Sequence, residues 1–147
     1  DCERRCRVRV ANPTTIRWCS DPTDTPGSGD FKQLQKLYLY QTQITDKAIE
    51  HLVECDFKQL QLLNLSNNKL TGMSIEHLIN CDFKELLILN LSSNKLTDSA
   101  IKVLIKCNFK QLKELGLAIT QISDLAIEYL IEADFKQLNQ LYLSGNK

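Results

Sequence analysis

Cysteine and histidine are the residues of this chain whose chemistry could serve metal binding, redox reactions or catalysis. Three of the six cysteines and both histidines recur at intervals of 26 residues: Cys55, Cys81 and Cys107, and His51 and His77. A metal site needs ligands that converge, such as two cysteines separated by two residues, and this spacing supplies no such pair. We therefore predict that the three cysteines pack in a column as small apolar groups and that the histidines lie exposed on helices.

The sequence also lacks the patterns of the common catalytic sites. It contains no phosphate-binding glycine loop, no G-x-G-x-x-G, no H-E-x-x-H and no Ser–His–Asp arrangement. Its carboxylates are spread along the chain rather than paired, and no Asp/Asn-rich spacing indicates a calcium site. We predict a non-catalytic protein that needs no cofactor and no metal.

Composition and charge argue against a nucleic-acid partner and against a membrane span. The 147 residues carry 18 Lys and Arg against 18 Asp and Glu, so the formal net charge is zero. Nucleic-acid binding needs a basic face that neutralises phosphates, so we expect no nucleic-acid partner. No apolar run approaches the roughly 20 residues that cross a bilayer, and we predict no membrane span.

From Asp30 onward the sequence repeats itself every 26 residues. Residues 30–55, 56–81, 82–107 and 108–133 form four full units, and residues 134–147 begin a fifth. A unit this short cannot bury its own apolar side, so it must stack on its neighbours. We predict a repeat domain over 30–147 and a separate N-terminal unit over 1–29, which holds all five arginines and ends in a turn-rich linker.

Each unit follows the pattern L-x-x-L-x-L-x-x-(N/T)-x-(L/I), with a strand first and a helix after it. The alternation of Leu63 and Leu65 predicts a strand with one buried face. Residues 97–105 switch to helical periodicity, with Thr97 as the N-cap and apolar residues along one stripe. A column of stacked phenylalanines then returns the chain to each next strand: Phe31, Phe57, Phe83, Phe109 and Phe135.

This pattern, repeated five times in register, resembles the leucine-rich repeat family. The resemblance implies an α/β solenoid with parallel strands on the concave face and short helices on the convex face. In that family the ninth motif position points inward and ties adjacent turns together, because a buried loop must satisfy its own N–H and C=O groups. Here that position is occupied by Thr42, Asn68, Asn94, Thr120 and Asn146.

The first 20 residues predict a β-hairpin that caps the open end of the first repeat. Residues 5–10 alternate between arginines and apolar side chains, residues 11–14 suit a four-residue turn, and residues 15–19 are rich in strand formers. Opposed cysteines on antiparallel strands can have the Cβ separation of a disulfide. Folding about this turn predicts three facing pairs: Val10 with Thr15, Val8 with Arg17, and Cys6 with Cys19.

This hairpin resembles the cysteine-rich N-terminal cap of extracellular leucine-rich repeat proteins, including variable lymphocyte receptors. Those caps run C-x3-C-x-C before a fourth cysteine, and they bond the first to the third and the second to the fourth. Cys2, Cys6 and Cys19 match the first, second and fourth, while Val8 stands at the third. The resemblance therefore implies a Cys6–Cys19 disulfide and leaves Cys2 without a partner. A disulfide indicates an oxidising compartment, so we predict secretion.

The cysteine-containing repeats favour an alternative. They look most like the subclass found in intracellular ubiquitin-ligase substrate receptors, which implies a cytoplasmic scaffold or a microbial effector. The extracellular resemblance instead implies a secreted immune-type receptor. Both hypotheses describe non-catalytic recognition, and the number of free thiols distinguishes them.

The strand alternation identifies the solvent-facing positions of the predicted concave face. Leu62 and Ile88 place two large apolar groups side by side with tyrosines nearby, and such clusters concentrate binding energy. Asn64 and Asn90 also begin N-x-S glycosylation sequences, and glycans there would obstruct the face. We predict that a protein or microbial-surface ligand binds ten of these positions: Lys36, Tyr38, Tyr40, Leu62, Asn64, Ile88, Asn90, Glu114, Gln140 and Tyr142.

The last repeat has no further repeat after it in the printed sequence. Its strand edge and its core side are therefore uncovered, which promotes association. We predict a homodimer through this repeat, with contacts from Leu138, Leu141 and Leu143.

Overall fold

A computed structural model of the chain describes residues 7–12, 15–19, 32–55, 57–81 and 83–147, the first two ranges as backbone only. Two antiparallel strands come first, β1 (Arg7–Asn12) and β2 (Thr15–Cys19). Strands and helices then alternate: β3 (Lys36–Tyr38), α1 (Asp46–Leu52), β4 (Leu62–Asn64), α2 (Gly72–Leu78), β5 (Ile88–Asn90), α3 (Asp98–Leu104), β6 (Glu114–Gly116), α4 (Asp124–Glu132) and β7 (Gln140–Tyr142).

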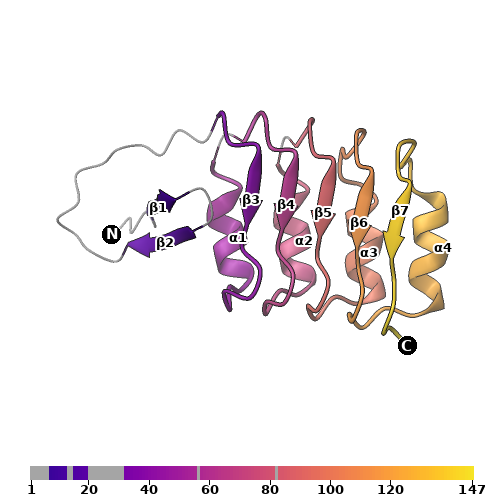
Figure 1. The fold of residues 1–147 in the computed structure, drawn as a ribbon. Coiled ribbons are helices and arrows are strands. Elements are labelled where there is room, and N and C mark those ends of the chain that lie inside the picture. The colour runs from indigo at the N-terminus through magenta and orange to yellow at the C-terminus, as the bar shows by residue number, and fades with distance from the viewer. Residues whose placement is uncertain (1–6, 13–14, 20–31, 56, 82) are drawn as a thin grey trace.

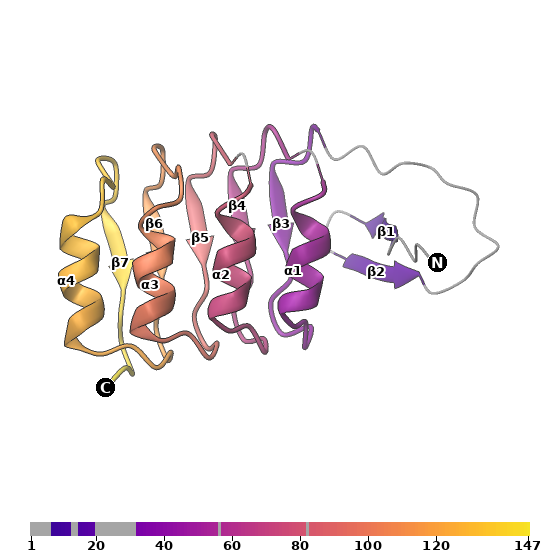
Figure 2. The same cartoon turned by 180° about the vertical axis from the view of Figure 1, so that it is seen from behind.

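The repeats form two layers, a parallel sheet and a row of helices. Strands β3 to β7 pair in sequence order, and the four helices lie behind them (Figure 1). The view from behind shows the helices side by side, one for each of the first four strands of the sheet (Figure 2). Each strand residue pairs with the residue 26 positions later on the next strand. The central leucines therefore form one row: Leu37, Leu63, Leu89, Leu115 and Leu141. The predicted α/β leucine-rich repeat solenoid is confirmed.

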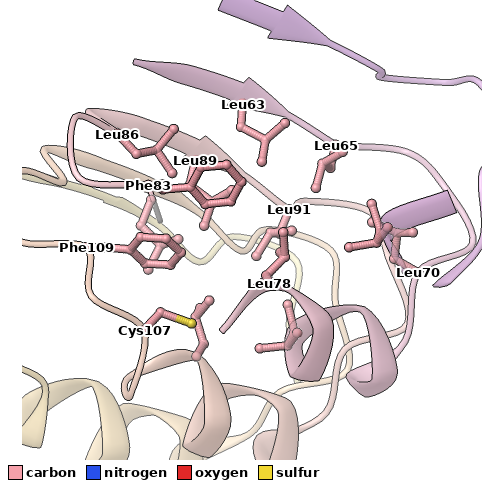
Figure 3. Close-up of a cluster of buried hydrophobic side chains, with 14 of the residues drawn as sticks. Leu63, Leu65, Leu70, Leu78, Phe83, Leu86, Leu89, Leu91, Cys107 and Phe109 are labelled. Carbon is pink, nitrogen blue, oxygen red and sulfur yellow. The ribbon is translucent and has the colours of Figure 1, made fainter. Parts of the chain in front are cut away.

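The core fills the space between the two layers. Figure 3 shows Leu63 and Leu89 of the strands and Leu78 of α2 in one interior cluster, with Phe83, Phe109 and Cys107 beside them. The rings of Phe57 and Phe83, and of Phe83 and Phe109, have centroids 6.3 Å apart, which confirms the phenylalanine column at these three positions. Phe135 in the last repeat is half-buried, and Phe31 lies outside the described residues.

The three repeat cysteines are free thiols in the same core, as predicted. Cys107 is buried, while Cys55 and Cys81 are half-buried. Burial raises the pKa of Cys81 and of Cys107 to about 12, and it also raises the pKa of Cys55. A thiol with so high a pKa is protonated at neutral pH, and it packs as an apolar group.

The ninth-position column ties neighbouring turns together where it holds asparagine. The amide nitrogen of Asn68 donates to the carbonyl of Leu39 in the previous repeat (2.7 Å) and to that of Leu65 in its own (2.9 Å). Asn94 donates in the same way to Leu65 (3.0 Å) and to Leu91 (2.9 Å). These bonds satisfy carbonyls that the turn leaves without backbone partners, so the column is structural.

Threonine in this column makes a different set of bonds. The hydroxyls of Thr42 and Thr120 donate to carbonyls of their own turns, those of Leu39 (2.7 Å) and Leu117 (3.0 Å). The backbone N–H of Thr120 donates to the amide oxygen of Asn146, 2.8 Å away in the next repeat. A short hydroxyl therefore holds its own turn, whereas asparagine also reaches the turn before it.

A second set of bonds joins the helix starts of successive repeats. The carboxylate of Asp46 accepts hydrogen bonds from the Thr71 backbone N–H (2.8 Å), the Thr71 hydroxyl (2.7 Å) and the Ser74 hydroxyl. Asp98 accepts the N–H (2.7 Å) and the hydroxyl (2.8 Å) of Ser123 in the same manner. The residue just before α2, Thr71, and the residue just before α4, Ser123, are thus each bound by a carboxylate of the previous repeat.

This arrangement corrects the predicted role of Thr97. Thr97 does occupy the N-cap position of α3, but its side chain makes no capping hydrogen bond. Its hydroxyl lies 2.8 Å from the hydroxyl of Ser99 instead. The repeat before it has Gly72 where Asp46 and Asp98 stand in theirs, so Thr97 has no carboxylate at that position of the previous repeat to bind.

The N-terminal hairpin forms, but its predicted register is wrong by one residue. Val8 pairs with Trp18 and Val10 with Ile16, and Cys19 lies opposite Arg7 rather than Cys6. The strands continue to Asn12 and resume at Thr15, and the register shifts between Val10 and Asn12. The connection is therefore shorter than the predicted four residues, which moves every facing pair. Cys2, Cys6 and the linker over 22–29 lie outside the described residues.

The last repeat exposes side chains that are core residues elsewhere. Leu141 is 39% exposed, whereas its equivalent Leu115 is fully buried. In the repeat before it, Ile127 of α4 is 37% exposed, whereas its equivalent Ile101 is fully buried. Leu138 and Leu143 are half-buried. The solvent access follows from the position of this repeat at one end of the stack.

Candidate functional site

The candidate site is the face of the β3–β7 sheet that lies opposite the helices, called here the strand face. Alternation along each three-residue strand sends the central leucine into the core and the two flanking residues outward. The parallel register then stacks the outward residues of neighbouring repeats in columns. All ten predicted ligand-binding positions lie in these columns or, for Tyr40, directly beyond them.

The centre of the strand face carries an apolar pair. Leu62 and Ile88 are partners in the ladder between β4 and β5, and both are half-buried although they point away from the core. Lys36 and Gln140 at the two ends of the same column are exposed, and Glu114 is half-buried. The sequence correctly predicted that these two large apolar side chains lie next to each other.

Tyrosines stand at the two ends of the strand face. Tyr38 and Tyr40 on the first repeat are 36% and 55% exposed, and Tyr142 on the last is 49% exposed. The Tyr142 hydroxyl donates a hydrogen bond to the side chain of Gln140. Three repeats lie between the two groups, so they do not form one cluster with the central pair. A ligand that touched all three regions would have to span the whole sheet.

Asn64 and Asn90 are held by their own strands. The amide oxygen of Asn64 accepts from the backbone N–H (3.1 Å) and the hydroxyl (2.7 Å) of Ser66, and that of Asn90 accepts from the Ser92 N–H (3.0 Å). Within the part of the chain that the structure describes, neither amide nitrogen has a hydrogen-bond partner. Both side chains are therefore fixed in place with N–H groups that can donate to a ligand.

The sequence did not reveal two features of the fourth repeat. Gly116 is buried, because the side chain of Asn90 lies over it. Ile119, in the turn after β6, is 63% exposed with a positive φ of 52°. The sequence did contain a signal for Ile119, because an isoleucine stands where the other repeats have a polar residue or glycine. Those equivalent residues are Gln41, Asn67, Ser93 and Gly145.

The helix face offers little chemistry. His51 and His77 are half-buried rather than exposed as predicted, because each helix is flanked by the next repeat. Within the described residues no group of three or more His, Cys, Asp or Glu side chains could hold a metal ion. Nor is any helix of that part of the chain long and apolar enough to cross a membrane.

Comparison with known proteins agrees with this geometry. A family model described as Leucine Rich Repeat matches residues 59–81, which contain β4, α2 and the turn between them. A search of curated proteins found no match to the chain.

Proposed function

Since the fold and the family match both indicate leucine-rich repeats, we propose that the chain is a secreted, immune-type recognition module that binds a protein or microbial-surface ligand on its strand face. Leucine-rich repeat domains generally mediate protein binding, and they are typically non-catalytic. The observation that carries the proposal is the Leu62–Ile88 pair, two large apolar side chains that face away from the core. Burying them against a partner removes apolar area from water.

The test is a binding screen against purified bacterial surface polymers and candidate proteins, followed by variants. The double variant Leu62→Arg, Ile88→Arg places two charges in the centre of the strand face and should abolish binding of any ligand found. Met73→Arg is the matched control, because Met73 is a 51% exposed apolar residue on the helix layer. Unchanged affinity of the double variant, or equal loss in the control, contradicts the proposed location.

The secreted setting rests on a Cys6–Cys19 disulfide, which only the resemblance of the cap implies, because the observed register places Cys19 opposite Arg7 and not opposite Cys6. Cys55, Cys81 and Cys107 are free thiols, so the remaining three cysteines decide the count. Thiol titration of the denatured, non-reduced chain should find four free thiols if that disulfide forms. Six free thiols would favour the second candidate, an intracellular scaffold, which the buried cysteine column supports.

A homodimer through Leu138, Leu141 and Leu143 is part of the proposal. The partial exposure of these core-type side chains supports it. Sedimentation of the printed chain at tens of micromolar should give a dimer, and Leu141→Glu should return it to a monomer. A wild-type chain that sediments as a monomer contradicts this part of the proposal.

A further inference from the structure

The connection from the third repeat to the fourth reverses the charge that the other connections carry. Five equivalent positions of each connection have a net charge of −2, −1 and −2 at the first, second and fourth connections, and of +4 at the third. The third connection holds Lys102, Lys106, Asn108, Lys110 and Lys113. The other three hold Glu50, Glu54, Asp56, Lys58 and Gln61; Glu76, Asn80, Asp82, Lys84 and Leu87; and Glu128, Glu132, Asp134, Lys136 and Asn139. The reversal therefore belongs to one connection and not to the repeat.

The four lysines of the third connection form one exposed strip, called here the lysine strip. Lys102 lies in the last turn of α3, and Lys106 follows four residues later, just beyond the end of the helix. Lys110 lies in the turn after it, and Lys113 stands directly before β6. All four side chains are exposed. Figure 2 shows α3 between α2 and α4, so the strip has a repeat on either side.

Helix stability does not explain the lysines at the end of α3. A cation in the last turn interacts favourably with the helix dipole. The other three helices nevertheless hold glutamate at the position of Lys102: Glu50, Glu76 and Glu128. The Lys102 ammonium lies 5.5 Å from the centre of the Tyr129 ring, a contact that supplies no counter-charge. Two lysines four residues apart also repel each other, so Lys106 adds a cost to the helix end.

Ion pairs within the chain do not explain the strip either. Across the residues that the structure describes, none of the four lysines forms an ion pair. In the last connection, by contrast, the Asp134 carboxylate lies 3.5 Å from the Lys136 ammonium. The third connection has Asn108 at the position of that aspartate, so Lys110 has no acid beside it there. The strip therefore presents four positive charges that the fold leaves without counter-charges.

We propose that the lysine strip binds a short acidic segment of a protein partner. This surface begins on the helix layer and stops before the strand face, so it is separate from the site proposed above. A row of carboxylates on the partner complements the four ammonium groups and offsets the repulsion among them. Such complementarity speeds association and fixes how the partner is oriented.

The acids around the strip limit the kind of anion that fits it. Glu76 in α2 and Glu128 in α4 stand at the position of Lys102 on either side, and Glu114 of the strand face follows Lys113. A sulfated polysaccharide, a nucleic acid or an anionic membrane carries charge over its whole extent and would meet these carboxylates as well. An acidic protein segment can end where the lysines end. Leucine-rich repeat domains also generally mediate protein binding, which favours the protein segment.

The experiment titrates a fluorescent peptide of alternating glutamate and glycine with the printed chain at low ionic strength, followed by anisotropy. Lys102→Glu, Lys106→Glu introduces the residues that the first and fourth connections already have, so the fold is retained. We expect the affinity to fall by about tenfold or more, and wild-type binding to weaken as salt is added. The control Lys69→Glu, Lys95→Glu changes the net charge equally at two exposed lysines in the turns after β4 and β5, and it should retain the affinity.

The remaining arms can overturn the proposal. Equal loss in the two double variants would show that net charge alone attracts the peptide. No binding to the wild-type chain would leave the strip without the proposed ligand. Heparin, a single-stranded oligonucleotide or phosphatidylserine vesicles that bind the strip more tightly than the peptide would identify a polymer or a membrane instead. Because Lys102→Glu, Lys106→Glu keeps Leu62 and Ile88, a failure here is separate from a failure of the strand-face proposal.

Discussion

The side chain of Asn90 occupies the space above Gly116 on the neighbouring strand. A Cβ at position 116 would lie 2.5 Å from the Asn90 amide oxygen and 3.0 Å from the Ser92 hydroxyl. That amide oxygen accepts the Ser92 N–H, so it cannot move without losing a hydrogen bond. The glycine is therefore required by a neighbour's side chain, although its own backbone has no positive φ.

Gly116→Ala should destabilise the fold by about 1 kcal/mol, the net value of the hydrogen bond that Asn90 must give up. Urea unfolding followed by circular dichroism measures the change. Ala118→Ser is the matched control, because Ser92 and Ser144 already occupy this column, and it should be close to neutral. A neutral Gly116→Ala would show that Asn90 can turn away without cost.

The loss of stability caused by a substitution at Asn68 should increase with the number of hydrogen bonds that it removes. Asn68→Leu removes bonds to the Leu39 and Leu65 carbonyls and from the Ile44 N–H, and it should cost about 1–3 kcal/mol. Asn68→Thr should cost less, because the threonines of this column still bond their own turns. Equal losses in both variants, measured by chemical denaturation, would contradict a role for the bridging bonds.

Ile119→Asn should stabilise the isolated chain by about 1 kcal/mol, because it relieves the left-handed strain of a β-branched residue. Differential scanning calorimetry measures the change, with Ser93→Asn as the reference for the same turn. A lower unfolding temperature would mean that contacts of Ile119 outweigh its strain.

The chain should lose stability in acid through Asp46 and Asp98. Burial alone would raise the pKa of Asp46, but hydrogen bonds from Ser74 and Thr71 lower it below its ordinary value of 3.8. Hydrogen bonds from Ser123 lower the pKa of Asp98. Their stabilisation is therefore complete above the unfolded pKa and is lost as the pH falls through the lower folded values.

Denaturation curves at successive pH values between neutral and 2 measure this loss. The variant Asp46→Asn, Asp98→Asn should be less stable at pH 7 and should lose less of its remaining stability below pH 3.8. Parallel curves for the variant and the wild type would show that the carboxylates do not hold the helix starts.

The repeat thiols should resist alkylation in the folded chain. The pKa of about 12 at Cys81 and at Cys107 keeps both protonated at pH 8, and only the thiolate reacts. In the folded chain iodoacetamide should modify half-buried Cys55 before buried Cys107. In denaturant it should modify all three cysteines rapidly. Peptide mass spectrometry measures both rates. Fast modification of Cys107 in the native chain would contradict its burial.

The sequence by itself determined the solenoid, because a 26-residue period of leucines can be buried only by stacking. It also placed Leu62 beside Ile88, since the register of a parallel repeat sheet equals the repeat length. Only the tertiary structure decided the hairpin register, because a shift between Val10 and Asn12 leaves no mark in an alternating pattern. The tertiary structure also showed why position 116 is glycine, because the side chain of Asn90 on the neighbouring strand fills the space there. It likewise showed the positive φ of Ile119, which depends on how the turn folds.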